Sequence, residues 1–244
     1  MLKLGLIAKR ELYMYFSTPI AYVFLIIFLL LNGLSTFYFG NFFARGQADL
    51  QSFFSFHPWI YMIFIPAISM RLWAEERKSG TIELLFTLPI TTLEIVLGKF
   101  LAAWLFSLIA LLLTFPIWLV VNYLGSPDNG VILASYIGSW LMAGAFLAIG
   151  AAVSASTKNQ VIAFVLTNLL CLVANLCGFP MIMDSMRAWL PQLVIDTITG
   201  FSFLTNFEVI SKGILDMRVL FFFLSLIVLA LFANVVIIEQ RKAD

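Results

Sequence analysis

The charged side chains of this sequence are most concentrated between residues 74 and 92, which include Glu75, Glu76, Arg77, Lys78 and Glu83. Gly80 is expected to end a helix that enters this segment, and Thr81 to cap a short new helix with Glu83 in its first turn. Leu88 precedes Pro89 and should therefore leave helical geometry. A short apolar helix beside a group of charges is typical either of a helix resting on lipid headgroups or of a docking element for a partner protein.

Histidine and cysteine, the residue types of many catalytic and metal sites, are scarce in the chain. The chain has one histidine, His57, and two cysteines, Cys171 and Cys177, which share one apolar run and are predicted to be unpaired packing residues. The Gly98-Lys99 pair lacks the surrounding glycine and hydroxyl residues of a phosphate-binding loop. We therefore expect no catalytic residue, no metal site and no cofactor bound by this chain.

The composition defines the class of protein. Of 244 residues, 62% are hydrophobic and only 11% are charged, and an ordinary soluble domain has about 25% charged residues. Such a chain cannot cover a globule with polar surface, which excludes a soluble enzyme, a secreted disulfide scaffold and a disordered protein. The formal net charge of +1 gives no field that would attract nucleic acid. The sequence predicts a membrane protein.

Six runs without Asp, Glu, Lys or Arg are each long enough to hold the roughly 20 apolar residues of a membrane-spanning helix. Their apolar residues are continuous and do not alternate, which favours helices over barrel strands. The predicted fold is therefore all-α, a single polytopic domain over residues 1–244 with six transmembrane helices. We place these near residues 19–40, 57–73, 99–123, 131–153, 160–179 and 219–238.

The basic residues predict the orientation. With both termini in the cytoplasm, ten of the 14 Lys and Arg residues fall on the cytoplasmic side and four outside, in agreement with the positive-inside rule. Residues 1–17 are modestly amphipathic and predict an interfacial helix, the alternative being a simple basic flank to the first span. Residues 180–218 are external and interleave charges with apolar residues, so we expect short helices that re-enter the outer leaflet. The alternative is a seventh, broken span, which the five charges within 196–218 disfavour.

Polar residues inside the spans are mainly amides and hydroxyls. Asn168, Cys171 and Asn175 recur at helical spacing and share one face of the fifth span. This face either forms interhelical hydrogen bonds or is a mildly polar wall of a translocation pathway or a dimer seam. In the fourth span, small residues predict close helix packing, within one chain rather than between two: Ala134, Gly138, Ala145, Ala148 and Ala152.

The run Glu75-Glu76-Arg77-Lys78-Ser79-Gly80-Thr81-Ile82-Glu83-Leu84-Leu85, followed by Leu88-Pro89, resembles the E-[KR]-x-x-G-T-[LI]-E-x-L…P segment of type-2 ATP-binding-cassette (ABC-2) permeases. The likeness extends to Arg10-Glu11-Leu12, to Gly98-Lys99 and to residues 207–216, and so covers nearly the whole chain. It is greatest to the branch that contains gliding-motility permeases and the permease of nitrous oxide reductase maturation.

This resemblance implies a half-transporter of the bacterial inner membrane, in which two six-span permeases, identical or paralogous, pair and dock two ATPase subunits. ATP and Mg would be bound by the ATPase, so this chain would not be an enzyme. Residues 74–92 would hold the coupling helix, and the residues matching the coupling region are Glu75, Glu76, Arg77, Gly80, Thr81 and Glu83. Residues 1–17 resemble the interfacial elbow helix and residues 180–218 the re-entrant external helices.

Three functions fit this sequence. The first is the permease of an ATP-driven exporter of apolar or amphipathic cargo. The second is a mechanical relay that drives an extracytoplasmic partner through residues 180–218 without transport. The third is an ion-coupled carrier or assembly factor, which the absence of charges near the middle of the spans disfavours.

Overall fold

The computed structural model describes residues 2–87, 89–187, 189–214 and 216–240, and over these residues the protein is helical without a β-strand. The helices of the first half are α1 (Leu2–Phe16), α2 (Pro19–Leu34) with its π-helical extension η1 (Ser35–Phe39), α3 (Gln51–Ser55), α4 (His57–Ser69), α5 (Arg71–Ser79), α6 (Thr81–Thr87) and α7 (Thr92–Leu112). Those of the second half are α8 (Phe115–Leu124), α9 (Asn129–Ser156), α10 (Gln160–Leu176), α11 (Pro180–Met186), α12 (Gln192–Gly200), α13 (Phe203–Ser211) and α14 (Met217–Gln240). The predicted all-α fold is confirmed.

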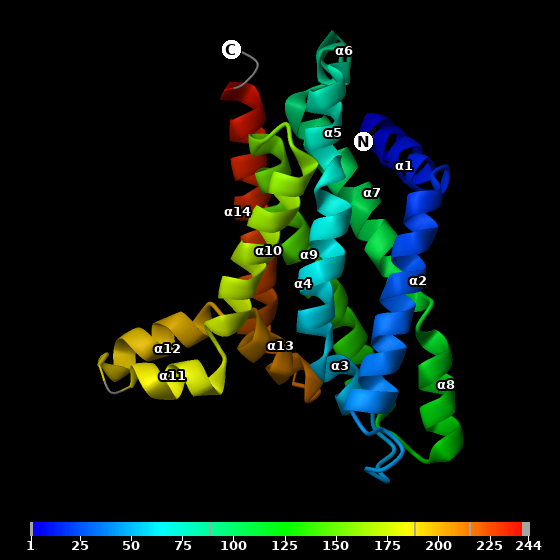
Figure 1. Ribbon diagram of the computed structural model, residues 1–244, viewed down its shortest axis with the longest axis vertical. Helices are drawn as coiled ribbons and strands as arrows, with labels where there is room; N and C mark the ends of the chain where they lie inside the picture. Colours follow the sequence, from blue (N-terminus) through cyan, green and yellow to red (C-terminus); the bar gives the residue numbers. More distant parts are fainter. Residues whose placement is uncertain (1, 88, 188, 215, 241–244) are drawn as a thin grey trace.

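Helix α9 is the centre of the bundle and packs against α4, α7, α10, α13 and α14 (Figure 1). Its small residues allow this close approach: a Cβ at Gly144 would lie 2.7 Å from the Trp104 indole nitrogen of α7. Trp104 and Trp140 stack with ring centroids 4.1 Å apart, and each indole N–H donates to the other residue's carbonyl oxygen. The prediction that the small residues of this span pack within the chain is therefore confirmed.

Among the residues that the structure describes, four stretches are long and apolar enough to cross a membrane: Pro19–Phe39, Thr92–Leu124, Asn129–Ser156 and Met217–Gln240. Two bent pairs, α10 with α11 at 68° and α12 with α13 at 69°, raise the number of candidate spans to as many as six. These stretches agree with four of the predicted spans, and α10 lies within a fifth. The fold is that of a polytopic membrane protein.

Two predicted spans are interrupted in the structure. The span expected over residues 57–73 is divided at Met70 between α4 and α5. The span expected over 99–123 begins earlier, at Thr92, and is broken between α7 and α8. Pro116 lies in the first turn of α8, where its missing N–H costs no helical hydrogen bond. The early start follows from a capping box, whose residues Thr91 and Glu94 have the spacing of this motif in the sequence and form it in the structure.

The two ends of the bundle differ in shape (Figure 1). Helices α1 and α6 and the end of α14 lie at one end, which we call the α6 end. The opposite end, which we call the α3 end, carries α3 and α13, and α11 and α12 lie across the long axis beside it (Figure 1). Residues 180–218 form short helices with Met181 and Leu193 exposed, and the bent pair of α12 and α13 is compatible both with re-entrant helices and with the alternative of a broken span. Leu88, predicted to end the short helix before Pro89, lies outside the described residues.

Candidate functional site

Helices α5 and α6 meet at Gly80, whose φ of 75° is in the left-handed region that favours glycine. The predicted end of α5 at Gly80 is therefore confirmed. Helix α6 starts at Thr81, as the sequence predicts for the new helix, and the Thr81 hydroxyl lies toward α5. It lies 2.9 Å from Ser79 Oγ and donates weakly to the Glu76 carbonyl oxygen. The hydroxyls therefore fasten the start of α6 to the end of α5.

Lys99 of α7 joins three helices at the base of α5. Its Nζ donates to Glu76 Oε1 of α5 at 2.6 Å and to Glu11 Oε2 of α1 at 3.2 Å. It also lies 5.4 Å from the centroid of the Trp73 ring, within the range of a cation–π contact. Lys99 is only 3% exposed, so its charge depends on these carboxylates for compensation.

The side of α1 that faces the protein is the side that carries Glu11, the partner of Lys99. Ala8 and Glu11 lie on the buried side of α1, and Leu6 and Tyr13 are exposed. Gly98 lets the helix approach α7, because a Cβ there would lie 2.6 Å from Ile7 Cγ2. A helix is therefore present where one was predicted, with Glu11 directed into the protein, and its location at a membrane interface stays a prediction.

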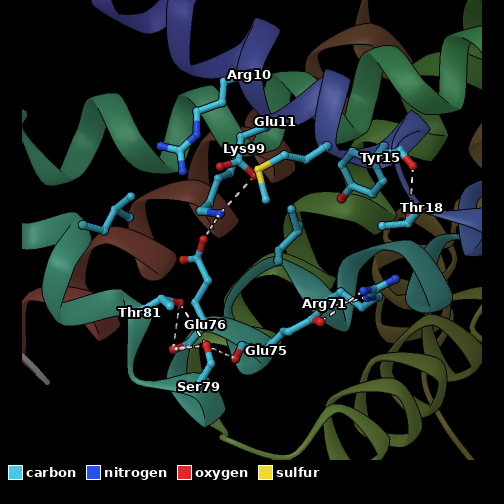
Figure 2. A pocket seen from close by; sticks show the side chains of 13 residues that line it. Arg10, Glu11, Tyr15, Thr18, Arg71, Glu75, Glu76, Ser79, Thr81 and Lys99 are labelled. Atoms are coloured by element: carbon cyan, nitrogen blue, oxygen red, sulfur yellow. Dashed lines mark hydrogen bonds and ion pairs between the residues drawn. The ribbon is translucent and has the colours of Figure 1, made fainter.

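A cavity of about 580 Å³ lies between α1, α5, α6 and α7 (Figure 2). Glu76 and Lys99 point toward one another on one side of it, and Arg10 and Glu11 enter from α1 (Figure 2). On the other side Arg71 donates to both carboxylate oxygens of Glu75, at 2.7 and 3.1 Å. The ionisable lining residues balance, three cationic and three acidic: Arg10, Arg71, Lys99, Glu11, Glu75 and Glu76. A balanced lining gives the cavity no preference for an anion or a cation.

The two neighbouring carboxylates of α5 titrate in opposite directions. The hydrogen bond and ion pair with Arg71 hold the pKa of Glu75 below its ordinary value of 4.5. Burial raises the pKa of Glu76 above 4.5, and this effect exceeds the opposing attraction of Lys99. One oxygen of Glu76, Oε2, is buried without a hydrogen-bond partner among the described residues, which agrees with the cost of ionising this group.

The structure brings together only part of the predicted coupling set. Glu75 and Glu76 line the cavity, and Arg77 instead donates to the Ala155 carbonyl oxygen of α9. Glu83 is exposed on α6, away from the cavity lining. Sequence reasoning missed Glu11 and Lys99 as members of the site. Lys99 carries a signal that could have revealed it, since it follows buried Ile95 by four residues and precedes buried Phe106 by seven on one helix face.

The residues predicted for a pathway or seam lie on α10. Cys171 and Asn175 are buried against the bundle, and Asn175 Nδ2 donates to the Pro58 carbonyl oxygen of α4 at 3.1 Å. Asn168 is half-buried, because the inward face of α10 is instead Ala163, Thr167, Cys171 and Asn175. Both cysteines are free thiols. This packing favours the interhelical hydrogen-bonding interpretation, and a role in a pathway or seam stays a prediction.

The α3 end contains a second polar contact, without formal charge. Ser139 Oγ of α9 lies 2.7 Å from His57 Nδ1 and 2.8 Å from the Tyr61 hydroxyl. The rings of Phe53 and Phe207 lie against the imidazole, with centroids 4.5 and 6.4 Å away. Within the described ranges, no three His, Cys, Asp or Glu residues gather as a metal site would require.

Residues 6–238 match the family described as ABC-2 family transporter protein. No individual curated protein is a significant match to the chain. Because the match covers nearly all of the sequence, the chain belongs to the ABC-2 transporter family. It is therefore a multi-pass membrane protein and a transport component, and family membership implies an ABC ATPase as its partner.

Proposed function

We propose that this protein is the permease subunit of an ATP-driven exporter in a bacterial inner membrane, coupled to its ATPase through α5 and α6. The observation that carries the proposal is the junction beneath α6, where Lys99 ties α5 to α1 and α7. Helix α6 projects from this junction at one end of the bundle (Figure 1). An ATPase bound there would push on a helix whose base is joined to the bundle by buried charge.

The proposed complex contains two permeases, of the same or a paralogous chain, and two ATPase subunits that bind ATP and Mg. The α6 end faces the cytoplasm in this proposal, which puts both termini there. The location of both termini on one side is supported by α1 and the end of α14, which lie at the α6 end of the molecule (Figure 1). ATP binding closes the ATPase pair, and the displacement of α6 rocks the permease halves.

The cargo is proposed to be apolar or amphipathic and to leave along a seam beside α10. The exposed face of α10 is apolar, with Val165, Leu169 and Val173 among its residues. Asn168 borders this face, and Cys171 and Asn175 would join the seam only when α10 separates from α4 and α9. The branch proposed for this chain is the gliding-motility and nitrous-oxide-reductase-maturation branch, to which the resemblance over nearly the whole sequence is greatest.

A second function, the mechanical relay without transport, is favoured by one observation. Helices α11 and α12 extend sideways from the α3 end and carry exposed Met181 and Leu193, a surface suited to a partner or to lipid (Figure 1). Flux of cargo that accompanies ATP hydrolysis would support export. Hydrolysis with movement of an extracytoplasmic partner and no flux would support the relay.

The proposal is tested by isolating the protein from host membranes in mild detergent and identifying what co-purifies. We expect an ATP-binding subunit with the wild-type protein and its loss with Glu83→Lys, because Glu83 is exposed on α6. Glu208→Lys is the matched control, since Glu208 is also an exposed helical glutamate but lies on α13. If no ATPase is recovered in any of several mild detergents, the carrier or assembly-factor function replaces the proposal.

A further inference from the structure

The junction between α4 and α5 is completed by a side chain from another helix. The last backbone hydrogen bond of α4 runs from Met70 N–H to the Pro66 carbonyl oxygen, at 2.9 Å. In the first turn of α5, the N–H groups of Trp73 and Ala74 donate to Ser154 Oγ of α9, at 3.2 and 3.1 Å. Ser154 Oγ in turn donates to the Met70 carbonyl oxygen at 3.0 Å.

These contacts use the full capacity of the serine hydroxyl, which has one donor and two acceptor positions. Ser154 is fully buried and Trp73 is 1% exposed, so water does not supply these bonds. A side chain inserted into the backbone ladder is a known cause of a break in a helix. The break at Met70 is therefore a site where α9 replaces hydrogen bonds that α4 would otherwise make with α5.

A second contact fastens α5 to the same turn of α9. The Arg77 guanidinium donates to the Ala155 carbonyl oxygen, one residue after Ser154. Gly150, one turn earlier, lets α9 approach the end of α4 closely, since a Cβ there would lie 2.1 Å from Ser69 Oγ. Helix α5 is thus held by α9 through both backbone and side chain.

We propose that Ser154 is a positioning residue that fastens α5 to α9, so that displacement of α6 enters the bundle through α9 and not along α4. The route by which motion travels rests on the proposed function, whereas the fastening is a property of this chain alone. Helix α9 is suited to receive the motion because it packs against α4, α7, α10, α13 and α14.

The fastening is tested by spin labels at Lys78 and Lys158, both exposed, in the full chain reconstituted in lipid nanodiscs with Cys171→Ala and Cys177→Ala. We expect Ser154→Ala to widen the 78–158 distance distribution about twofold, because local opening follows the loss of stabilising contacts. Ser154→Thr keeps the hydroxyl, so its 78–158 distance distribution should be as narrow as that of the labelled protein with Ser154. Ser156→Ala is the matched control, since that hydroxyl bonds only the Val153 carbonyl oxygen of its own helix.

The inference is overturned if the 78–158 distance distribution of Ser154→Ala is no wider than that of Ser156→Ala. It is also overturned if the distribution of Ser154→Thr is as wide as that of Ser154→Ala. A second measurement needs no variant: hydrogen exchange of the wild-type chain should protect the Trp73 and Ala74 amides as strongly as the middle of α9. Rapid exchange of these two amides would also overturn the inference.

The route is tested in the complex with the ATPase. Binding of a non-hydrolysable nucleotide should shift the distance from Ile63 of α4 to Lys78 and leave the 78–158 distance unchanged. In Ser154→Ala the 78–158 distance should shift as well, with the ATPase still bound. A shift of the 78–158 distance in the labelled protein that retains Ser154 contradicts the inference. Failure of the wild-type chain to bind an ATPase contradicts the proposed function, and the nanodisc and exchange results still decide the fastening.

Discussion

At the α6 end of the bundle, Lys99 joins two carboxylates from α1 and α5, whereas at the α3 end Ser139 joins an imidazole and a phenol of α4. Both contacts are buried and both connect segments far apart in the sequence. The first is made of formal charges, and the second of neutral groups packed among phenylalanine rings.

This difference bears on how each end responds to change. Buried charges attract strongly but are costly when one partner is removed, so their contact depends on which groups are ionised. Neutral hydrogen bonds within apolar surroundings are weaker and do not depend on a charged partner. We infer that removal of one group from the buried contact costs more stability at the α6 end than at the α3 end.

The largest expected effect is at Lys99. Lys99→Met leaves Glu11 and Glu76 buried without their cation, and removal of one partner of a buried ion pair costs about 3–5 kcal/mol of unfolding free energy. Denaturant titration in detergent micelles measures this loss. Lys78→Met is the matched control, because Lys78 is an exposed lysine of α5, and it should change stability little.

The same site allows a sharper form of this test. The triple variant Glu11→Gln, Glu76→Gln and Lys99→Met removes all three charges, and replacement of a whole buried ionic group is often nearly neutral. We expect it to recover most of the stability lost in Lys99→Met. If the triple variant is as unstable as the single variant, packing and not charge holds the α6 end together.

A smaller effect is expected at the α3 end. Ser139→Ala removes the partner of His57 and Tyr61, and an interhelical hydrogen bond in a membrane protein contributes about 1 kcal/mol. We therefore expect a loss of about 1–2 kcal/mol in the same titration. Ser225→Ala is the control, since its hydroxyl bonds only its own helix. A loss as large as that of Lys99→Met would remove the contrast between the ends.

The pH dependence should distinguish the two neighbouring carboxylates of α5. The pKa of Glu76 is raised in the folded protein, so its contribution to stability is full below pH 4.5 and falls as the pH rises through its folded pKa. The pKa of Glu75 is lowered, so its contribution is present above pH 4.5 and lost as the pH falls through its folded pKa. Stability differences between wild type and Glu76→Gln or Glu75→Gln, measured across pH, should have opposite slopes. Equal slopes would contradict this assignment.

The smallest effect is expected from the partly exposed pair of Arg71 and Glu75. Arg71→Gln should cost about 0.3–0.5 kcal/mol, as is usual for exposed ion pairs one helical turn apart, and high salt should remove the difference. Thermal unfolding at low and high salt measures this. If the loss of stability in Arg71→Gln persists at high salt, this pair behaves like the buried charges around Lys99, and the prediction is wrong.

Much of the fold follows from local sequence patterns. Hydropathy predicts the long helices, and Gly80 predicts the end of α5. The residues from Thr91 to Glu94 predict the start of α7, and the small residues of α9 predict its close packing. These features depend on neighbours along one helix. The break at Met70 does not, because it depends on Ser154, 84 residues away.

The candidate site was harder to predict for the same reason. Glu76 and Lys99 are 23 residues apart and Glu11 and Lys99 are 88 apart, so their contact depends on how α1 packs on α7. The sequence predicts that a span begins at Lys99, whereas α7 already begins at Thr92. Lys99 therefore lies in the second turn of α7 and not at the boundary of the helix. On α10, helical spacing alone did not distinguish Asn168 from Thr167, and packing against Gly150 turns Thr167 inward.

The central claim, that the α6 end is the end coupled to an ATPase, is tested most directly by photocrosslinking in native membranes. A photoreactive amino acid is placed at Glu83 on α6 or at Asp184 on α11, two exposed acidic positions at opposite ends. We predict an adduct with an ATP-binding subunit at position 83 and none at position 184. An ATPase adduct at 184, or its absence at 83 in membranes where the ATPase co-purifies with the permease, would contradict the account.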